Sequence, residues 1–172
     1  RSFDDRSGVA CLLEVAKRLT GKELPVSVAI LLSDGEELGM RGAATAAFNI
    51  KADEAIAVDV SFGDGIGISE TECGKLSEGA MIGVSPVLCR ELSDRLIDLA
   101  EQNGIKYQLE VMGGKTGTNA DVISVSRGGV KTCTVSIPLR NMHTPAETLD
   151  LKDVSAVVEL ITAFVKGEAA HE

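Results

Sequence analysis

One histidine and several carboxylates are the side chains of this sequence that could do chemistry together. Each carboxylate stands just before an expected helix, just after an expected strand, or near the end of one. The residues are Asp4, Asp5, Glu36, Glu37, Asp59 and His143. Because the carboxyl ends of strands in an open α/β sheet meet in one crevice, we expect these side chains to converge there. Taken singly, each carboxylate is typical of a solvated loop charge or a helix cap, and a lone histidine is more often structural.

A group of carboxylates around one imidazole predicts a metal ion. If Asp4 joins Glu37, Asp59 and His143, the three carboxylates repel one another unless a cation lies between them. Mixed histidine and carboxylate ligands suit zinc and similar first-row ions. The other histidine, His171, lies next to the last residue, and we assign no role to it.

The adjacency of Glu36 and Glu37 allows two separate roles. Neighbouring side chains of an extended segment point to opposite sides, so one glutamate can bind the ion while the other faces the substrate. The second glutamate could then take a proton from a water molecule that the ion acidifies to a pKa of about 7. This pattern is typical of metal-assisted hydrolysis.

Alternating helices and strands are expected to position these residues. Apolar spacing predicts helices at 7–20, 42–48 and 86–103, the last of these capped by Ser85. A final helix is expected to start at Asp150 and to bury Leu151, Val154, Val158, Ile161 and Val165. Apolar runs predict buried strands at 26–32 and 55–60, and further strands at 107–111 and 130–137. The alternation predicts an α/β fold of three layers, with a central, mostly parallel sheet flanked by helices.

The composition of the 172 residues bounds the class of protein. A hydrophobic share of 44% and a charged share of 25% are typical of one globular domain. The net charge of −9 repels phosphate backbones, so we expect no nucleic-acid partner. No apolar run reaches the about 20 residues that cross a bilayer, and no secretory signal is visible, so we expect no membrane partner. Four widely spaced cysteines without a Cys-x-x-Cys pair indicate a reducing, cytoplasmic compartment.

The glycine-rich segment 113–121 gives no support for nucleotide binding. Gly114-Lys115-Thr116 resembles the end of a phosphate-binding loop, but that motif needs a glycine five positions before Gly114, where Leu109 stands. We therefore expect a flexible loop that enters a short helix.

Four motifs in order make the chain similar to a known family, and together they extend over nearly its whole length. The motifs are Phe3-Asp4-Asp5-Arg6-Ser7-Gly8, Glu36-Glu37-Leu38-Gly39-Met40-Arg41-Gly42-Ala43, Ala57-Val58-Asp59-Val60-Ser61 and Pro138-Leu139-Arg140-Asn141-Met142-His143-Thr144-Pro145-Ala146-Glu147. They resemble the cytosolic dinuclear metallopeptidases that include glutamyl, deblocking and tetrahedral (TET) aminopeptidases. Some members of that family were once labelled endoglucanases. The resemblance implies a zinc-peptidase-like fold.

The resemblance implies a set of metal ligands. Asp4 would bridge two divalent metal ions, which are zinc or alternatively cobalt or manganese. Glu37 and His143 would complete one metal site with Asp4. Asp59 would belong to the other site.

The resemblance also implies residues that act beside the metal ions. Glu36 would be the general base. Asp5 would be joined to Asp4 through a cis peptide bond. The segment 113–121 is similar to the family's Gly-Thr-Asp-Ala loop beside the substrate pocket, with Asn119 in place of the acid.

The chain departs from the family pattern in three respects. Family members carry a further metal-binding histidine in a His-x-Asp motif upstream of the Asp-Asp pair, whereas no histidine precedes His143 here. They also insert a dimerisation domain before that pair. We therefore expect residues 1–172 to be the C-terminal part of a longer catalytic domain. In addition, Ser33-Asp34-Gly35 stands before Glu36, where a Thr-Gln or Val-Gln pair is usual.

The leading interpretation is a metal-dependent aminopeptidase that removes N-terminal residues from peptides and whose full-length form is a homo-oligomer. A second interpretation is a catalytically silent relative that acts as a structural or assembly unit, which the lost histidine favours. A glycoside hydrolase of the endoglucanase type is the third, because paired carboxylates also act on sugars. Four Phe, one Tyr and no Trp leave little surface for stacking sugars, so this interpretation ranks last.

Overall fold

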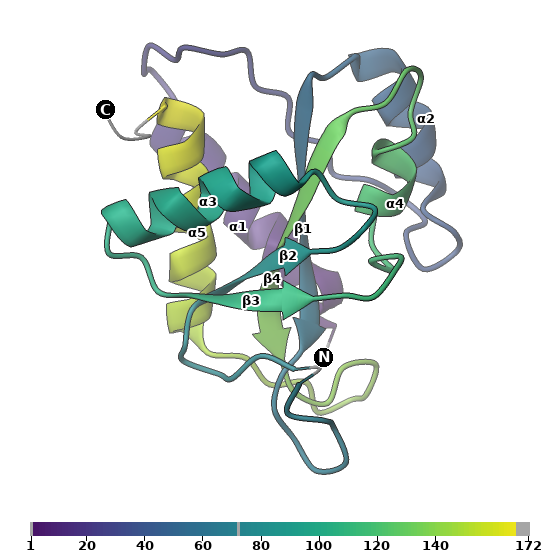
Figure 1. The fold of residues 1–172 in the computed structure, drawn as a ribbon, viewed down its shortest axis with the longest axis vertical. Helices are drawn as coiled ribbons and strands as arrows, with labels where there is room; N and C mark the ends of the chain where they lie inside the picture. The colour runs from purple at the N-terminus through teal and green to yellow at the C-terminus, as the bar shows by residue number, and fades with distance from the viewer. Residues whose placement is uncertain (1, 72, 168–172) are drawn as a thin grey trace.

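One mixed four-stranded sheet forms the centre of the fold in the computed structural model, which describes residues 2–71 and 73–167 (Figure 1). The strands are β1 (Glu54–Phe62), β2 (Ala80–Val84), β3 (Tyr107–Val111) and β4 (Lys131–Leu139). Their order across the sheet is β1-β4-β2-β3. The pairs β1–β4 and β2–β3 are parallel, whereas β2 and β4 are antiparallel. The expectation of a mostly parallel sheet is therefore confirmed.

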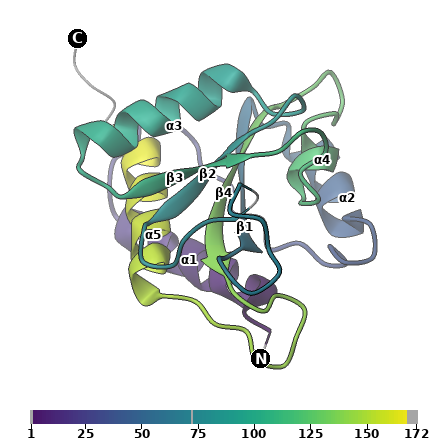
Figure 2. The same ribbon diagram turned by 60° about the horizontal axis from the view of Figure 1, so that its bottom comes forward.

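Helices cover both faces of this sheet and give the three expected layers (Figures 1 and 2). The helices are α1 (Phe3–Leu19), α2 (Arg41–Ile50), α3 (Arg90–Gln102), α4 (Ala120–Ile123) and α5 (Leu151–Lys166). Helices α1, α3 and α5 pack over the main core, to which the sheet contributes Val60, Ile82 and Val135. A smaller cluster, in which Ala57 contacts Ala120 of α4, covers part of the opposite face.

The helix expected at 7–20 begins earlier as α1, but its first residues are irregular. Asp4 and Asp5 have non-helical backbone angles, with ψ of 112° and 52°. The regular helix therefore starts close to the predicted Ser7.

The start of α3 differs from the prediction. The helix begins at Arg90 with Cys89 as its N-cap, and Ser85 does not cap it. The Ser85 hydroxyl donates instead to the carbonyl oxygen of Gly114, which removes it from the capping position. Residues 85–88 form a turn, closed by the bond from the Leu88 amide to the Ser85 carbonyl oxygen.

The segment 26–32 is not the buried strand that its apolar run predicts. It is extended, but it forms no ladder with any described strand. Its alternate side chains are exposed: Val26 by 55%, Val28 by 41%, Ile30 by 38% and Leu32 by 51%. An apolar run indicates that a segment favours burial, but it contains no information about whether a neighbouring strand is there to cover it.

Helix α5 starts as predicted, because the Asp150 side chain accepts the Lys152 amide at the N-cap. The expected burial of Leu151 is wrong: this side chain opens the first turn and is 77% exposed, since no core side chain covers it. Val154 is half-buried, while Val158, Ile161 and Val165 are buried.

None of the helices in the described part of the chain combines the length and apolarity needed to cross a bilayer. The four cysteines, Cys11, Cys73, Cys89 and Cys133, are unpaired. His171 lies outside the described residues.

Two leucines of α5 that differ in exposure provide a test of the core. Leu160 is fully buried and Leu151 is largely exposed, although both lie on α5. We expect Leu160→Ala to lower the free energy of unfolding by about 2–5 kcal/mol, because it leaves a cavity in the main core. Leu151→Ala should change it by about 0.5 kcal/mol at most. Urea unfolding of both variants measures the difference, and equal losses would contradict this packing.

Candidate metal centre

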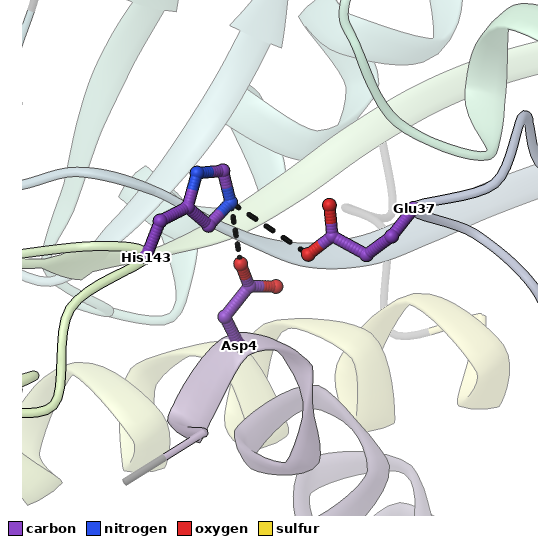
Figure 3. A group of neighbouring side chains, drawn as sticks. All are labelled: Asp4, Glu37 and His143. Carbon is purple, nitrogen blue, oxygen red and sulfur yellow. Dashed lines mark ion pairs between the residues drawn. The ribbon is translucent and has the colours of Figure 1, made fainter.

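Three of the predicted site residues converge at one edge of the fold (Figure 3). The Nε2 atom of His143 lies 2.9 Å from Oδ2 of Asp4 and 3.7 Å from Oε1 of Glu37. One possible ligand atom of each of the three residues lies within 4.8 Å of the other two. The three side chains line a pocket of about 380 Å³. They come from the start of α1, the loop before α2 and the loop after β4.

The start of α1 presents Asp4 to the pocket, and the next residue, Asp5, is half-buried. The peptide bond between the two residues is cis, as the resemblance implies. The Asp5 carboxylate accepts the Gly8 amide at 2.8 Å. A side chain at Gly8 would overlap the carboxylate of Asp5, so this close approach requires glycine. Asp5 is thereby held away from Glu37 and His143.

The loop that carries Glu36 and Glu37 is folded back on itself. The Gly42 amide donates to the Asp34 carbonyl oxygen at 2.9 Å, and the Met40 amide donates to that of Glu36 at 2.8 Å. A Cβ atom at Gly42 would lie 2.5 Å from the Asp34 backbone, so glycine is needed there as well. These contacts fix where the two glutamates leave the backbone.

The beginning of the Glu36 loop is also tied to the segment 113–121. The Asn119 side-chain amide donates to the Ser33 hydroxyl at 2.9 Å. This contact joins the loop before α2 to the segment that leads into α4.

The loop 141–148 carries His143 in an unfavourable backbone conformation. His143 has φ of 60° and Asn141 has φ of 56°, a region that residues other than glycine seldom adopt. The loop is closed at its base by a pair of backbone bonds between Arg140 and Thr148, at 2.9 and 3.0 Å. A strained conformation of this kind persists where surrounding contacts determine it, and it is frequent at functional sites.

Two half-buried carboxyls, those of Asp5 and Asp59, are not among the residues that line the pocket. Burial, and then the charge of Asp59, raises the pKa of Asp5 to about 8. Burial raises the pKa of Asp59 to about 7, and the charges of Glu36 and Asp4 act in the same direction. The charges of these predicted site residues therefore interact, although Asp59 does not join the three ligand atoms in the pocket.

Burial and the same repulsion raise the pKa values of Asp4, which lines the pocket, and of Glu36, which is not part of its lining. Burial and the neighbouring charge of Glu37 raise the pKa of Asp4, which only His143 opposes among the side chains acting on it. Burial and Glu37 likewise raise the pKa of Glu36. A divalent cation would relieve this repulsion, and one imidazole with two carboxylates is a donor set that suits zinc. The residues present thus fit a metal ion.

Two further acidic residues near the site, Glu147 and Glu110, were given no role in the sequence analysis, although Glu147 ends the fourth motif. Glu147 lines the same pocket and accepts the Phe3 amide. Glu110 of β3 accepts the Ser136 hydroxyl at 2.8 Å, and its charge acts on Asp59. The sequence signal available for Glu147 was its position four residues after His143. The proximity of Glu110 to Asp59 depends on the order of the strands in the sheet, which the sequence did not indicate.

Comparison with known proteins identifies a peptidase family. The M42 glutamyl aminopeptidases match residues 1–160. The lysyl aminopeptidase of Pyrococcus furiosus is 32% identical over 164 residues, which are 95% of this chain and 47% of that protein. The chain spans about half the length of the curated relatives it matches.

Solved structures share this fold. Aminopeptidase APDkam598 from the archaeon Desulfurococcus kamchatkensis gives a TM-score of 0.90 at 34% identity, covering 97% of this chain and 48% of that one. The Pyrococcus horikoshii TET1 peptidase, which can assemble into a tetrahedron or a large octahedral shell, gives a TM-score of 0.80 at 34% identity. That match covers 96% of this chain and 48% of the TET1 chain. The α/β fold expected from the sequence is therefore confirmed.

The raised pKa values predict how stability depends on pH when metal is withheld. In the folded chain, Asp5 and Asp59 hold protons up to pH values of about 8 and about 7, at which the unfolded chain has released them. Their contribution to stability is complete below about pH 4 and is lost as the pH rises through these values. Urea unfolding with a chelator should show the free energy of unfolding falling between about pH 5 and about pH 8.

Two variants isolate this effect. Asp59→Asn removes one of the titrating groups and should flatten the pH dependence. Asp98→Asn removes an exposed carboxylate of α3 and should leave it unchanged. If the free energy of unfolding of Asp59→Asn depended on pH as steeply as that of the wild type, the raised pKa of Asp59 would be contradicted.

Proposed function

We propose that this chain, which belongs to the M42 glutamyl aminopeptidase family, forms a metal centre that removes N-terminal residues from peptides. The observation that carries the proposal is the convergence of Asp4, Glu37 and His143, whose ligand atoms lie within 4.8 Å of one another. The family match and the likeness to solved aminopeptidases support the reaction class.

The proposed ligand roles are those that the resemblance implies, and the convergence of three of the residues supports them. Asp4, Glu37 and His143 would hold one divalent ion, which we propose to be zinc, with cobalt and manganese as alternatives. Asp4 would also contact a second ion together with Asp59, whose half-buried carboxyl is repelled by the charge of Asp4. Bound ions supply Lewis acidity and lower the pKa of water to about 7. Asp5 would hold the start of α1 through the Gly8 amide, and so fix the direction of Asp4.

Glu36 is proposed as the general base. It is adjacent to Glu37 in sequence, and it is half-buried beside the ligands. Burial and the charge of Glu37 raise its pKa, which moves it toward the range in which a carboxylate accepts and returns a proton efficiently. The carboxylate would take a proton from the attacking water and deliver it to the leaving amine.

The finer features of the activity belong to the full-length protein. We propose a homo-oligomer in the cytoplasm, because the TET1 relative forms large shells and all four cysteines here are unpaired. We also propose that residues 1–172 are part of a catalytic domain that has a second histidine elsewhere. This proposal follows from Asp59 lacking an imidazole beside it among the described residues.

Substrate classes separate the aminopeptidase from the other two interpretations. An aminopeptidase cleaves peptide-type chromogenic substrates and stops when the metal is chelated. A glycosidase cleaves glycoside substrates and is insensitive to chelation, and a silent relative cleaves neither. The assay on the full-length protein therefore tests the proposed reaction directly.

The metal site can be tested on this chain by calorimetric titration with zinc. We expect binding near one ion per chain, because one three-ligand set is assembled here. His143→Ala should weaken binding by more than about a hundredfold, since losing a ligand costs more than the 10–100-fold typical of an outer-shell partner. Asp98→Asn is the control for loss of a distant charge. Equal binding by His143→Ala and the wild type would remove His143 from the site.

The role of Glu36 predicts a variant that binds metal without turnover. Glu36→Gln in the full-length protein should retain zinc affinity and lose about 10²–10⁴-fold in kcat, the usual contribution of a general base. Glu23→Gln, at an exposed position after α1, should leave kcat unchanged. Unchanged turnover by Glu36→Gln, with zinc bound, would exclude Glu36 as the base.

A further inference from the structure

We infer that Glu147 is a positioning residue of the metal centre, which holds the backbone beside Asp4 against the loop that carries His143. The inference rests on the proposed metal site. Oε2 of Glu147 accepts the backbone amide of Phe3 at 2.6 Å. The two residues are 144 positions apart in the sequence, and each is close to a proposed ligand.

The Phe3 amide needs an acceptor that its own helix cannot supply. The first amides of a helix have no intrahelical partner. Ser2, the N-cap of α1, provides no side-chain bond. The carboxylate of Glu147 fills this place. Because Asp4 and Asp5 are not helical, Phe3 precedes the regular part of α1, and Glu147 anchors this irregular segment from a distant loop.

The anchored segment leads directly into Asp4. The carbonyl oxygen of Phe3 accepts the Ser7 hydroxyl at 2.6 Å, so Phe3 is held at both its amide and its carbonyl. Asp4 follows with a half-buried side chain. Release of the Phe3 amide would free one of these two anchors and allow the Asp4 carboxylate to move.

The other end of the contact is a loop of fixed shape. Arg140 and Thr148 close its base, and the Asn141 side-chain amide donates to the Ala146 carbonyl oxygen at 3.2 Å. His143 and Glu147 lie within this closed loop, so their relative position is set by its internal bonds. The bond between Glu147 and Phe3 thus helps to set the 2.9 Å separation of His143 Nε2 and Asp4 Oδ2.

Glu147 is distinct from the ligands themselves. It lines the pocket with them, but it is not one of the three residues whose ligand atoms converge. One of its carboxylate oxygens is already engaged by the Phe3 amide. Its charge also raises the pKa of Asp4, and the contact with the Phe3 amide adds an effect that acts through the backbone.

Three substitutions of Glu147 separate the effect of side-chain length from that of charge in a calorimetric zinc titration of this chain. Glu147→Gln keeps the length and a carbonyl oxygen that can accept the Phe3 amide, but it loses the charge. Glu147→Asp keeps the charge and is one methylene shorter, and Glu147→Ala loses both. We expect zinc affinity within about threefold of wild type for Glu147→Gln. We expect a loss of about tenfold or more for Glu147→Asp and Glu147→Ala, as for other residues that orient metal ligands.

The outcomes distinguish this inference from the proposed site. Wild-type affinity in Glu147→Ala would overturn the inference and leave the metal centre intact. So would loss in Glu147→Gln with retention in Glu147→Asp, because charge would then be what matters. A wild-type chain that binds no zinc would overturn both proposals. Thermal unfolding of the metal-free variants checks that they fold, and Glu23→Ala is the matched control at an exposed position.

A second readout reports the bond itself without metal. Amide hydrogen exchange at Phe3 should be faster in Glu147→Asp and Glu147→Ala than in the wild type and in Glu147→Gln. Equal protection in all four proteins would show that Glu147 does not hold this amide, and would overturn the inference even if the variants are too unstable for titration.

Discussion

Repulsion between carboxylates is the interaction on which the organisation of this site depends. The fold brings Asp4 near both Glu37 and Asp59, with Asp5 half-buried near Asp59, and His143 is the partner that favours the ionised form of Asp4. Such a cluster costs stability in the empty chain and favours binding of a divalent cation. The fixed backbone around it prevents the carboxylates from moving apart, and so keeps them available to the ion.

Two of the four proposed ligands, Glu37 and His143, are carried by loops, whereas Asp4 lies at the start of α1 and Asp59 lies in β1. Asp59 lies in β1, beside Ser136 of β4, and both strands run toward the edge where His143 follows. The loops are held by their own bonds, and glycines of the adjoining helices allow close approaches, Gly8 of α1 to Asp5 and Gly42 of α2 to Asp34. The precision of the site is therefore local to a few turns, while the sheet only determines which turns are neighbours.

Sequence analysis predicted correctly those elements whose formation depends only on residues of the same segment. The strand at 107–111 has the predicted bounds, and the cap at Asp150 depends on one side chain and one nearby amide. The three converging residues were predicted from the ends of elements and from the family motifs. The start of α3 was missed because Ser85 bonds to a distant loop, and the burial of 26–32 was missed because it depends on a neighbour. Glu147 was missed for a similar reason, since its partner is far away in sequence.

The exposed segment 26–32 has a consequence for how the chain behaves in concentrated solution. An extended, unpaired apolar edge is a template on which another polypeptide can add a strand, including the same edge of a second copy. The net charge of −9 opposes such encounters, and dissolved salt screens charge over about 10 Å at 0.1 M. Added salt should therefore favour self-association of the chain through this exposed apolar segment.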